Sequence, residues 1–255
     1  MQQGMLNGKN AVIYGGGGGI GGAVAEAFSR EGARVFLAGR TPEPLEAVAA
    51  KIRHAGGTVD TALLDATNER AVREHADDVV AAAGSLDISL NVIQHGDVQG
   101  TPMVEMPLAD YLRPVATAVQ TFFLTSQAAA RQMMRQRSGV ILVFGGSGDP
   151  VPGLYLGGLL TAFEAMEAMR RQLASELGSY GIRVLTLRSG GIPETLPENM
   201  EGAGEIADAI TKSTMLGHAA TLEDVGYAAA FAASDRAASM TAATLNISAG
   251  ALIDR

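Results

Sequence analysis

Residues 11–21 read Ala-Val-Ile-Tyr-Gly-Gly-Gly-Gly-Gly-Ile-Gly, and this stretch decides the fold. The apolar run at its start predicts a strand, and the segment that follows the glycines predicts a helix. Glycines let the backbone turn tightly and approach phosphates, while the first turn of a helix offers N–H groups to negative charge. The stretch therefore predicts a dinucleotide site, the alternative being a tight turn without a ligand. The residues expected to contact the dinucleotide are Gly15, Gly19, Ile20 and Gly21.

The rest of the chain alternates short aliphatic or β-branched runs with long amphipathic segments. This pattern is typical of βαβ units, so we expect an α/β fold: a single doubly wound parallel sheet of Rossmann type, with helices on both faces. The predicted strands span residues 10–14, 34–38, 58–64, 87–93, 139–145, 182–188 and 243–247. The predicted helices span residues 19–31, 42–55, 68–83, 108–136, 157–178 and 221–234.

Nothing in the sequence divides the chain, because it contains no internal repeat and no low-complexity linker. We therefore expect one domain over residues 1–255. Residues 191–217 differ from the rest, because they are polar and their start is rich in Gly, Pro and Glu. We interpret them as an excursion from the sheet edge that forms a lid over a site.

Composition excludes several classes of function. The 255 residues are 47% hydrophobic, carry a net charge of −8 and include no cysteine, which excludes a thiol nucleophile, a disulfide and a thiolate metal site. We assign no metal site. A span of about eighteen apolar residues and a secretion signal are both lacking, so we expect no membrane partner and a cytoplasmic location. Without a basic stripe, we expect no nucleic-acid partner.

The end of the second predicted strand reads Ala-Gly-Arg-Thr over residues 38–41. Many NAD sites have a carboxylate here, which binds the 2′-hydroxyl of the adenosine ribose. The guanidinium of Arg40 suits a 2′-phosphate instead, so we expect NADP(H), the alternative for Arg40 being a solvated loop position. Asp65, after the third strand, is placed to accept a hydrogen bond from the adenine amino group or to cap the next helix.

These features resemble the short-chain dehydrogenase/reductase family over essentially the whole chain. The segments that carry the resemblance are residues 14–21, 86–91, 173–177, 181–184 and 243–250. The resemblance implies a Rossmann-type domain that binds NAD(P), a small-molecule substrate, and a homodimer or homotetramer built on long helices. It also implies that Asn91, after the fourth strand, and Gly190, in a Ser-Gly pair where the family has Pro-Gly, belong to the cofactor site.

The reductases of that family use an Asn, a Ser, a Tyr that donates the proton, and a Lys that lowers the pKa of the Tyr and binds the nicotinamide ribose. Aligned by their surroundings, these four positions fall on Thr117, Gly146, Leu159 and Phe163. Leu159 and Phe163 are four apart and share one helix face, yet neither can transfer a proton. No lysine lies on this helix. The resemblance therefore implies a member without the usual tetrad.

Other polar groups near the carboxyl ends of the strands are candidates for the chemistry. Tyr155 offers a phenol, Ser147 a hydroxyl and His95 an imidazole that can act as a general acid near neutral pH. Arg188 ends a mostly buried strand and can hold an anionic substrate or a cofactor phosphate. Packing and turn positions are the alternatives for the first three.

Two functions of different classes follow. The first is an NADP(H)-dependent oxidoreductase with a non-standard proton donor, or one whose substrate needs little help, such as an iminium or an enone. The second is a cofactor-binding but catalytically silent paralogue; a non-redox enzyme that reuses the pocket is a third. An open cleft lined by Tyr155, His95 and Arg188 favours the first, and a cleft filled by Leu159 and Phe163 favours the second. Apolar residues in and around the lid indicate a mostly apolar substrate, namely Leu196, Met200, Met215 and Leu216.

Overall fold

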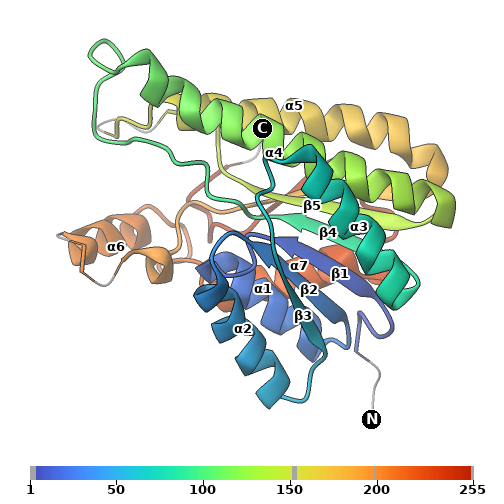
Figure 1. The fold of residues 1–255 in the computed structure, drawn as a ribbon. Helices are drawn as coiled ribbons and strands as arrows, with labels where there is room; N and C mark the ends of the chain where they lie inside the picture. The colour runs from blue at the N-terminus through green and yellow to red at the C-terminus, as the bar shows by residue number, and fades with distance from the viewer. Residues whose placement is uncertain (1–3, 151–153, 198, 201, 254–255) are drawn as a thin grey trace.

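The computed structural model describes residues 4–150, 154–197, 199–200 and 202–253. In this part of the chain a seven-stranded sheet has the order β3-β2-β1-β4-β5-β6-β7, and every pair of neighbours is parallel (Figure 1). The chain starts at the centre, builds outward to β3, returns beside β1 and builds outward to β7. This order confirms the predicted doubly wound α/β fold.

The strands agree with the predicted ranges to within two residues at each end. They are β1 (Asn10–Tyr14), β2 (Arg34–Gly39), β3 (Val59–Leu63), β4 (Ile88–Asn91), β5 (Gly139–Gly145), β6 (Ile182–Arg188) and β7 (Ala243–Asn246). The α-helices are α1 (Gly19–Arg30), α2 (Pro42–His54), α3 (Glu69–Ala83), α4 (Leu108–Gln136), α5 (Gly158–Leu177), α6 (Ala203–Lys212) and α7 (Leu222–Ala233).

Helices cover both faces of the sheet. One face packs against α1, α2 and α7, and the other packs against α3, α4 and α5 (Figure 1). Side chains of β1 alternate accordingly, because Ala11 and Ile13 belong to the first apolar cluster while Val12 and Tyr14 belong to the second. With both faces covered, the central strands are buried throughout, and their carboxyl ends form one edge where loops meet.

Two element ends differ from the predicted ones for identifiable reasons. The predicted strand 87–93 ends at Asn91, whose side-chain oxygen accepts a hydrogen bond from Ile93 N at 3.2 Å and turns the chain out of the ladder. The cap of α3 is Asn68, whose side chain accepts from Ala71 N at 3.1 Å. The alternative role of Asp65 as that cap is therefore wrong.

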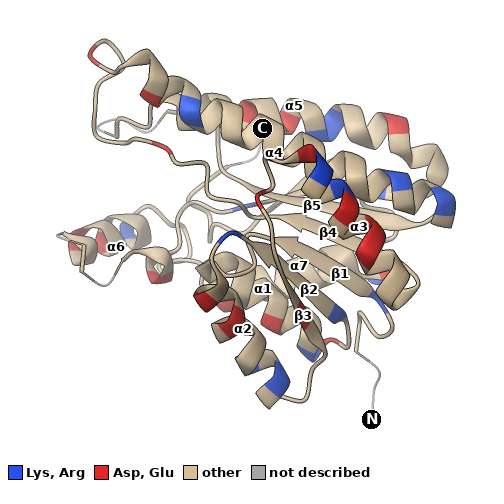
Figure 2. Ribbon diagram, in the orientation of Figure 1, with Lys and Arg blue, Asp and Glu red and all other residues tan. Residues whose placement is uncertain are grey.

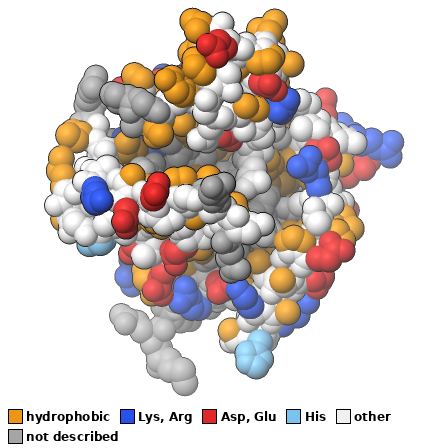
Figure 3. Space-filling model, turned by 90° about the vertical axis from the view of Figure 1, so that its left-hand side faces the viewer, with side chains coloured by type: hydrophobic (Ala, Val, Ile, Leu, Met, Phe, Trp, Pro, Cys, Tyr) orange, Lys and Arg blue, Asp and Glu red, His pale blue; other side chains and the backbone are white. Residues whose placement is uncertain are grey.

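The excursion predicted over residues 191–217 contains a helix that the sequence did not predict, α6, which extends away from the sheet (Figure 1). Residues 198 and 201 of this segment lie outside the described residues. None of the α6 side chains is buried. The end of the segment is anchored, because Met215 N and Leu216 N both donate to Ala249 O, at 3.0 and 3.1 Å. The surface beside α6 is hollowed (Figure 3).

Charged residues of both signs are interspersed on the outer helices (Figure 2). Exposed ion pairs such as Arg70–Glu74 on α3, at 2.7 Å, join neighbouring turns. Over the described ranges, no helix is long and apolar enough to cross a membrane.

Candidate functional site

The glycine turn between β1 and α1 forms a cradle that side chains would fill. Gly15 has a φ of +89°, and a Cβ there would lie 2.8 Å from Val92 O. A Cβ on Gly21 would overlap the carbonyl oxygen of Gly15. At the N-cap of α1, Gly18 provides no side-chain cap, so the first-turn N–H groups stay open to a ligand. This geometry fits the pyrophosphate of a dinucleotide.

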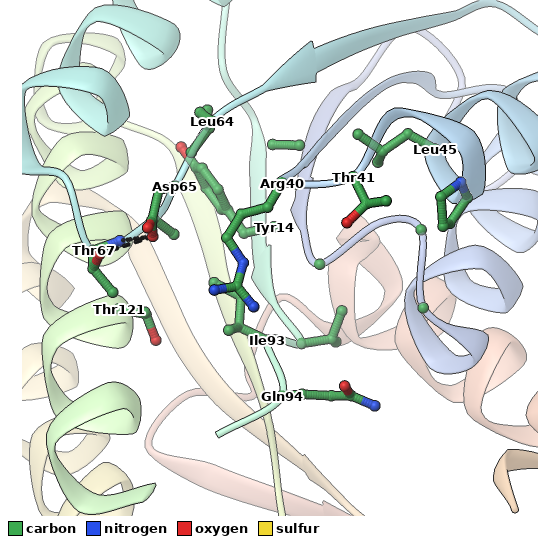
Figure 4. Close-up of a pocket in the computed structure, with 18 of the residues that line it drawn as sticks. Tyr14, Arg40, Thr41, Leu45, Leu64, Asp65, Thr67, Ile93, Gln94 and Thr121 are labelled. Atoms are coloured by element: carbon green, nitrogen blue, oxygen red, sulfur yellow. Dashed lines mark hydrogen bonds between the residues drawn. The ribbon is translucent and has the colours of Figure 1, made fainter. Parts of the chain in front are cut away.

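A cavity of about 280 Å³ opens beside this turn (Figure 4). It brings together Gly15 of the turn, Arg40 after β2 and Asp65 after β3, three residues predicted for the cofactor site. Residues 92–94 after β4 and two threonines of α4, Thr117 and Thr121, complete its wall. The cavity thus lies at the carboxyl edge of β1–β4, on the side where such sheets bind nucleotides.

Arg40 is exposed, and its side chain extends across the cavity between Asp65 and Gln94 (Figure 4). The Asp65 carboxylate accepts hydrogen bonds from Thr67 N at 2.9 Å and from Thr67 Oγ1 at 2.8 Å. These two bonds, with the positive charge of Arg40, lower the pKa of Asp65 below its usual value. Asp65 is therefore an ionised hydrogen-bond acceptor at the cavity wall, and Arg40 is a cation beside it.

Tyr14, the last residue of β1, forms the inner wall of the cavity. The side chain is buried, and its hydroxyl has no hydrogen-bond partner among the described residues. Burial raises the pKa of Tyr14. The ring meets that of His75 edge to face, with centroids 5.9 Å apart, and burial lowers the pKa of His75. The cavity thus ends on the neutral ring of Tyr14, which the imidazole of His75 contacts from behind the wall.

Asn91, predicted for the cofactor site, lies behind the cavity rather than in its wall. Its amide nitrogen donates to Thr125 Oγ1 at 3.1 Å, and its oxygen accepts from Ile93 N. Only 3% of Asn91 is exposed. Its visible role is to fix the start of the loop over residues 92–94, which does line the cavity.

A second group of predicted residues meets where β5, α5 and the loop after β4 converge. The ring of Phe163 lies so close over Gly146 that any Cβ on Gly146 would overlap it. The same ring packs edge to face against His95, with centroids 6.1 Å apart. His95 is only 7% exposed, and burial lowers its pKa although the nearby Asp97 acts in the opposite direction. The imidazole is therefore held in its neutral form near pH 7.

The loop after β5 is polar. Ser147 Oγ donates to Asp149 Oδ2 at 3.3 Å and accepts from Asp149 N at 3.0 Å. The carboxylate of Glu164, one residue after Phe163, lies against Gly148. Tyr155, in the loop before α5, is 50% exposed, and its carbonyl oxygen accepts from Gly100 N at 2.9 Å. Ser147 and Tyr155 thus lie in the same connection, between β5 and α5.

Arg188 is the last residue of β6, and Gly190 lies two residues after it. Side chains alternate along a strand, so half-buried Arg188 is on the same sheet face as Thr186, which donates to Glu167 of α5. Arg188 therefore points to the α5 side of the sheet, where Phe163 lies. A Cβ on Gly190 would lie 2.7 Å from Ala251 Cβ, which explains why a glycine fits this position.

Within the described ranges, no three His, Asp or Glu side chains come together in a group that could hold a metal ion. The groups that do converge are a glycine cradle, a cation, a carboxylate and aromatic rings.

Comparisons with known proteins agree with this architecture. Residues 16–251 match the family described as Enoyl-(Acyl carrier protein) reductase. The chain is 32% identical over 251 residues to secoisolariciresinol dehydrogenase of Forsythia intermedia, covering 96% of this chain and 89% of that protein. It is 28% identical over 247 residues to 7alpha-hydroxysteroid dehydrogenase of Escherichia coli K12, covering 96% and 94%.

Solved structures show the same relationship. A short-chain type dehydrogenase/reductase from Mycobacterium marinum superposes with a TM-score of 0.86 at 28% identity, covering 98% of this chain and 97% of that one. A short-chain dehydrogenase/reductase from Serratia marcescens gives a TM-score of 0.84 at 28% identity, covering 96% and 98%. The chain therefore belongs to the short-chain dehydrogenase/reductase family of oxidoreductases.

Proposed function

We propose that the chain is an NADP(H)-dependent oxidoreductase of a small, mostly apolar molecule, with an active site that departs from its family's usual one. The observation that carries this proposal is the cavity that joins the glycine cradle, Arg40 and Asp65. A guanidinium with no carboxylate at the end of β2 favours a 2′-phosphate over a 2′-hydroxyl.

The residues present fit the dinucleotide. Gly15, Gly19, Ile20 and Gly21 would hold its pyrophosphate, Arg40 its 2′-phosphate and Asp65 its adenine amino group. Asn91 would act indirectly by shaping the loop at residues 92–94, while Arg188 and Gly190 would border the nicotinamide end. When bound as NADPH, the cofactor supplies a hydride.

We further propose that the family's Asn-Ser-Tyr-Lys tetrad is replaced by Thr117, Gly146, Leu159 and Phe163. Support comes from the contact between Phe163 and Gly146, because an aromatic ring at the lysine position leaves no room for a serine side chain. The two replacements are sterically matched, as expected of a site rebuilt around a different side chain.

Tyr155, Ser147 and His95 remain the polar candidates for contact with the substrate at the reacting end. Tyr155 is the most exposed of the three, while His95 is buried and Ser147 is bonded to Asp149. A proton donor is needed only for a substrate that leaves an alkoxide after hydride addition. Residues 191–217 would form a lid over this end, within one domain that assembles as a homodimer or homotetramer.

A catalytically silent, cofactor-binding protein is the second candidate, because Phe163 packs into the nicotinamide side of the site. Calorimetric titration with NADPH and with 2′,5′-adenosine bisphosphate, which lacks the nicotinamide half, separates the two. An oxidoreductase should bind NADPH at least about tenfold more tightly than the bisphosphate, since a second half-site adds contacts. Equal affinities would favour the silent protein, and failure of both to bind would overturn the proposal.

A further inference from the structure

The reacting end of the site offers little that could protonate an alkoxide. A ketone that receives a hydride at carbon becomes an alkoxide, and its reduction normally needs a positioned proton donor. The first turns of α5 provide Leu159 and Phe163 instead. His95 packs on the Phe163 ring with its pKa lowered, so it is neutral near pH 7. The Ser147 hydroxyl is bonded within its own loop. Phe163 and His95 therefore give this end of the site an aromatic surface without a strong acid.

Carboxylates outnumber cations in the three segments at the carboxyl ends of β4, β5 and β6. In their described part, residues 97–113, 146–164 and 188–217 contain eight acidic and three basic side chains. Two exposed carboxylates gather at the loop after β5, where Glu164 lies against Gly148 and Asp149 bonds to Ser147. This excess of negative charge favours the approach of a cationic substrate over that of an anionic one.

Phe163, which is half-buried, carries no positive charge that would oppose a cation. The face of an aromatic ring attracts a positive charge that approaches it closely, whereas a lysine at the same position would repel one. Arg188 is the opposing charge on this side of the sheet, but it is half-buried at the end of β6. Glu164 is exposed, so its carboxylate is accessible to an arriving substrate.

The segments at this edge of the sheet also suit a substrate with an apolar body. Ten of the fifteen large hydrophobic side chains exposed on the described residues lie on residues 103–112, 154–155 and 200–216. They include Val104, at 94% exposure, and Met215, at 69%. In Figure 3 hydrophobic side chains gather on both sides of the hollow beside α6. Exposed apolar groups in this concentration mark a surface that receives an apolar ligand.

We propose that the substrate is an iminium compound with an apolar body, a proposal that rests on the NADP(H)-dependent function above. The hydride from bound NADPH brings both electrons of the new C–H bond to the iminium carbon. The π electrons of the C=N bond become the lone pair on nitrogen, so the products are a neutral amine and NADP⁺. No proton is consumed, so the reaction needs no proton donor at the position of Leu159.

The test compares two bicyclic substrates of similar shape. N-methyl-3,4-dihydroisoquinolinium is permanently charged and needs no proton, while 1-tetralone is a neutral ketone. The expected kcat/KM with NADPH is at least about 100-fold higher for the iminium compound, the low end of what a proton donor contributes.

Equal or better turnover of 1-tetralone would overturn the iminium proposal, and so would a protein that binds NADPH but reduces neither compound. Failure to bind NADPH at all would instead overturn the function on which it rests. These outcomes are distinguished by the calorimetric titration with NADPH described above.

A binding readout is independent of turnover. In the complex with NADP⁺, which carries no hydride to transfer, Glu164→Gln should weaken calorimetric binding of the iminium compound about fivefold, the upper range for an exposed charge pair. Glu176→Gln is the matched control, because Glu176 is an exposed glutamate on the same helix, about 18 Å further along. Equal binding by the two variants would contradict the proposed role of the Glu164 carboxylate.

Discussion

At the scale of single residues, the contact between Phe163 and Gly146 is the feature that most separates this protein from the pattern its sequence resembles. The alignment placed the two residues on two separate family positions. Only the structure shows that the ring occupies the space above the glycine. Side-chain volume in a folded core is shared between segments that are distant in sequence, so the contact could not be predicted from either segment alone.

Gly146→Ser should lower the free energy of unfolding by about 1–3 kcal/mol, the usual cost of overpacking. In a Phe163→Ala background the same substitution should cost much less, because the ring that it meets is gone. Urea-induced unfolding measures both values. Gly178→Ser is the control, since no atom lies within 4 Å of a Cβ at Gly178. Equal costs in both backgrounds would show that the ring does not lie over the glycine.

Tyr14→Phe should leave the protein as stable as before or about 1 kcal/mol more stable, because it removes a buried hydroxyl without a partner. Tyr111→Phe is the opposite case. It removes a hydroxyl bonded to Thr161 Oγ1 at 2.8 Å and should lower stability by about 1 kcal/mol. Thermal unfolding of the two variants measures both changes in stability. A loss at Tyr14 as large as at Tyr111 would mean that its hydroxyl has a partner in solution, such as a bound water.

At the scale of elements, the strands and six of the α-helices followed the sequence because alternation and apolar periodicity report burial directly. Helix α6 was not predicted, and none of its side chains is buried, so its sequence carries no such burial pattern. Glycines at 202 and 204 and prolines at 193 and 197 make the sequence before and at its start look like a loop. A helix that protrudes from the sheet leaves a weaker pattern than one that packs against it.

The capping box of α7 offers a test at this scale. Thr221 accepts from Asp224 N at 3.1 Å, and Asp224 accepts from Thr221 N at 2.9 Å. Thr221→Ala should lower the free energy of unfolding by about 1 kcal/mol. Thr41→Ala is the matched control, because Thr41 occupies the N-cap of α2 without a side-chain cap bond. The account of helix capping is contradicted if both substitutions cost the same.

At the scale of the whole molecule, the doubly wound parallel sheet and the edge where its strand ends meet could be predicted, because parallel βαβ topology fixes where those ends lie. Arg40 and Asp65 each follow a strand and line one cavity, while their roles toward an adenosine stay predictions. The end of the site near Phe163 is harder to predict from the sequence. Its character depends on which side chains fill the space between α5, β5 and the loop after β4, which is a property of the packed molecule.

Stability of the whole molecule should depend on pH through two histidines, half-buried His75 and buried His95. Burial lowers the pKa of His75 and of His95, so the unfolded chain binds more protons below about pH 6.5. The free energy of unfolding should therefore fall as pH is lowered from 7.5 to about 5.5, a range above the carboxyl titrations. His75→Gln should flatten this dependence, whereas the exposed His54→Gln should not. A slope that is equal in both variants would refute the assignment.

The central claim is that the cavity beside the glycine turn selects NADP(H) through Arg40. Calorimetric titration of the purified protein with NADPH and NADH tests it most directly, with Arg40→Ala as the companion variant. The account predicts that NADPH binds at least about tenfold more tightly than NADH, the range of a charge-assisted phosphate contact, and that Arg40→Ala removes this preference without weakening NADH. Equal affinities for the two dinucleotides, or a preference that survives in Arg40→Ala, would contradict it.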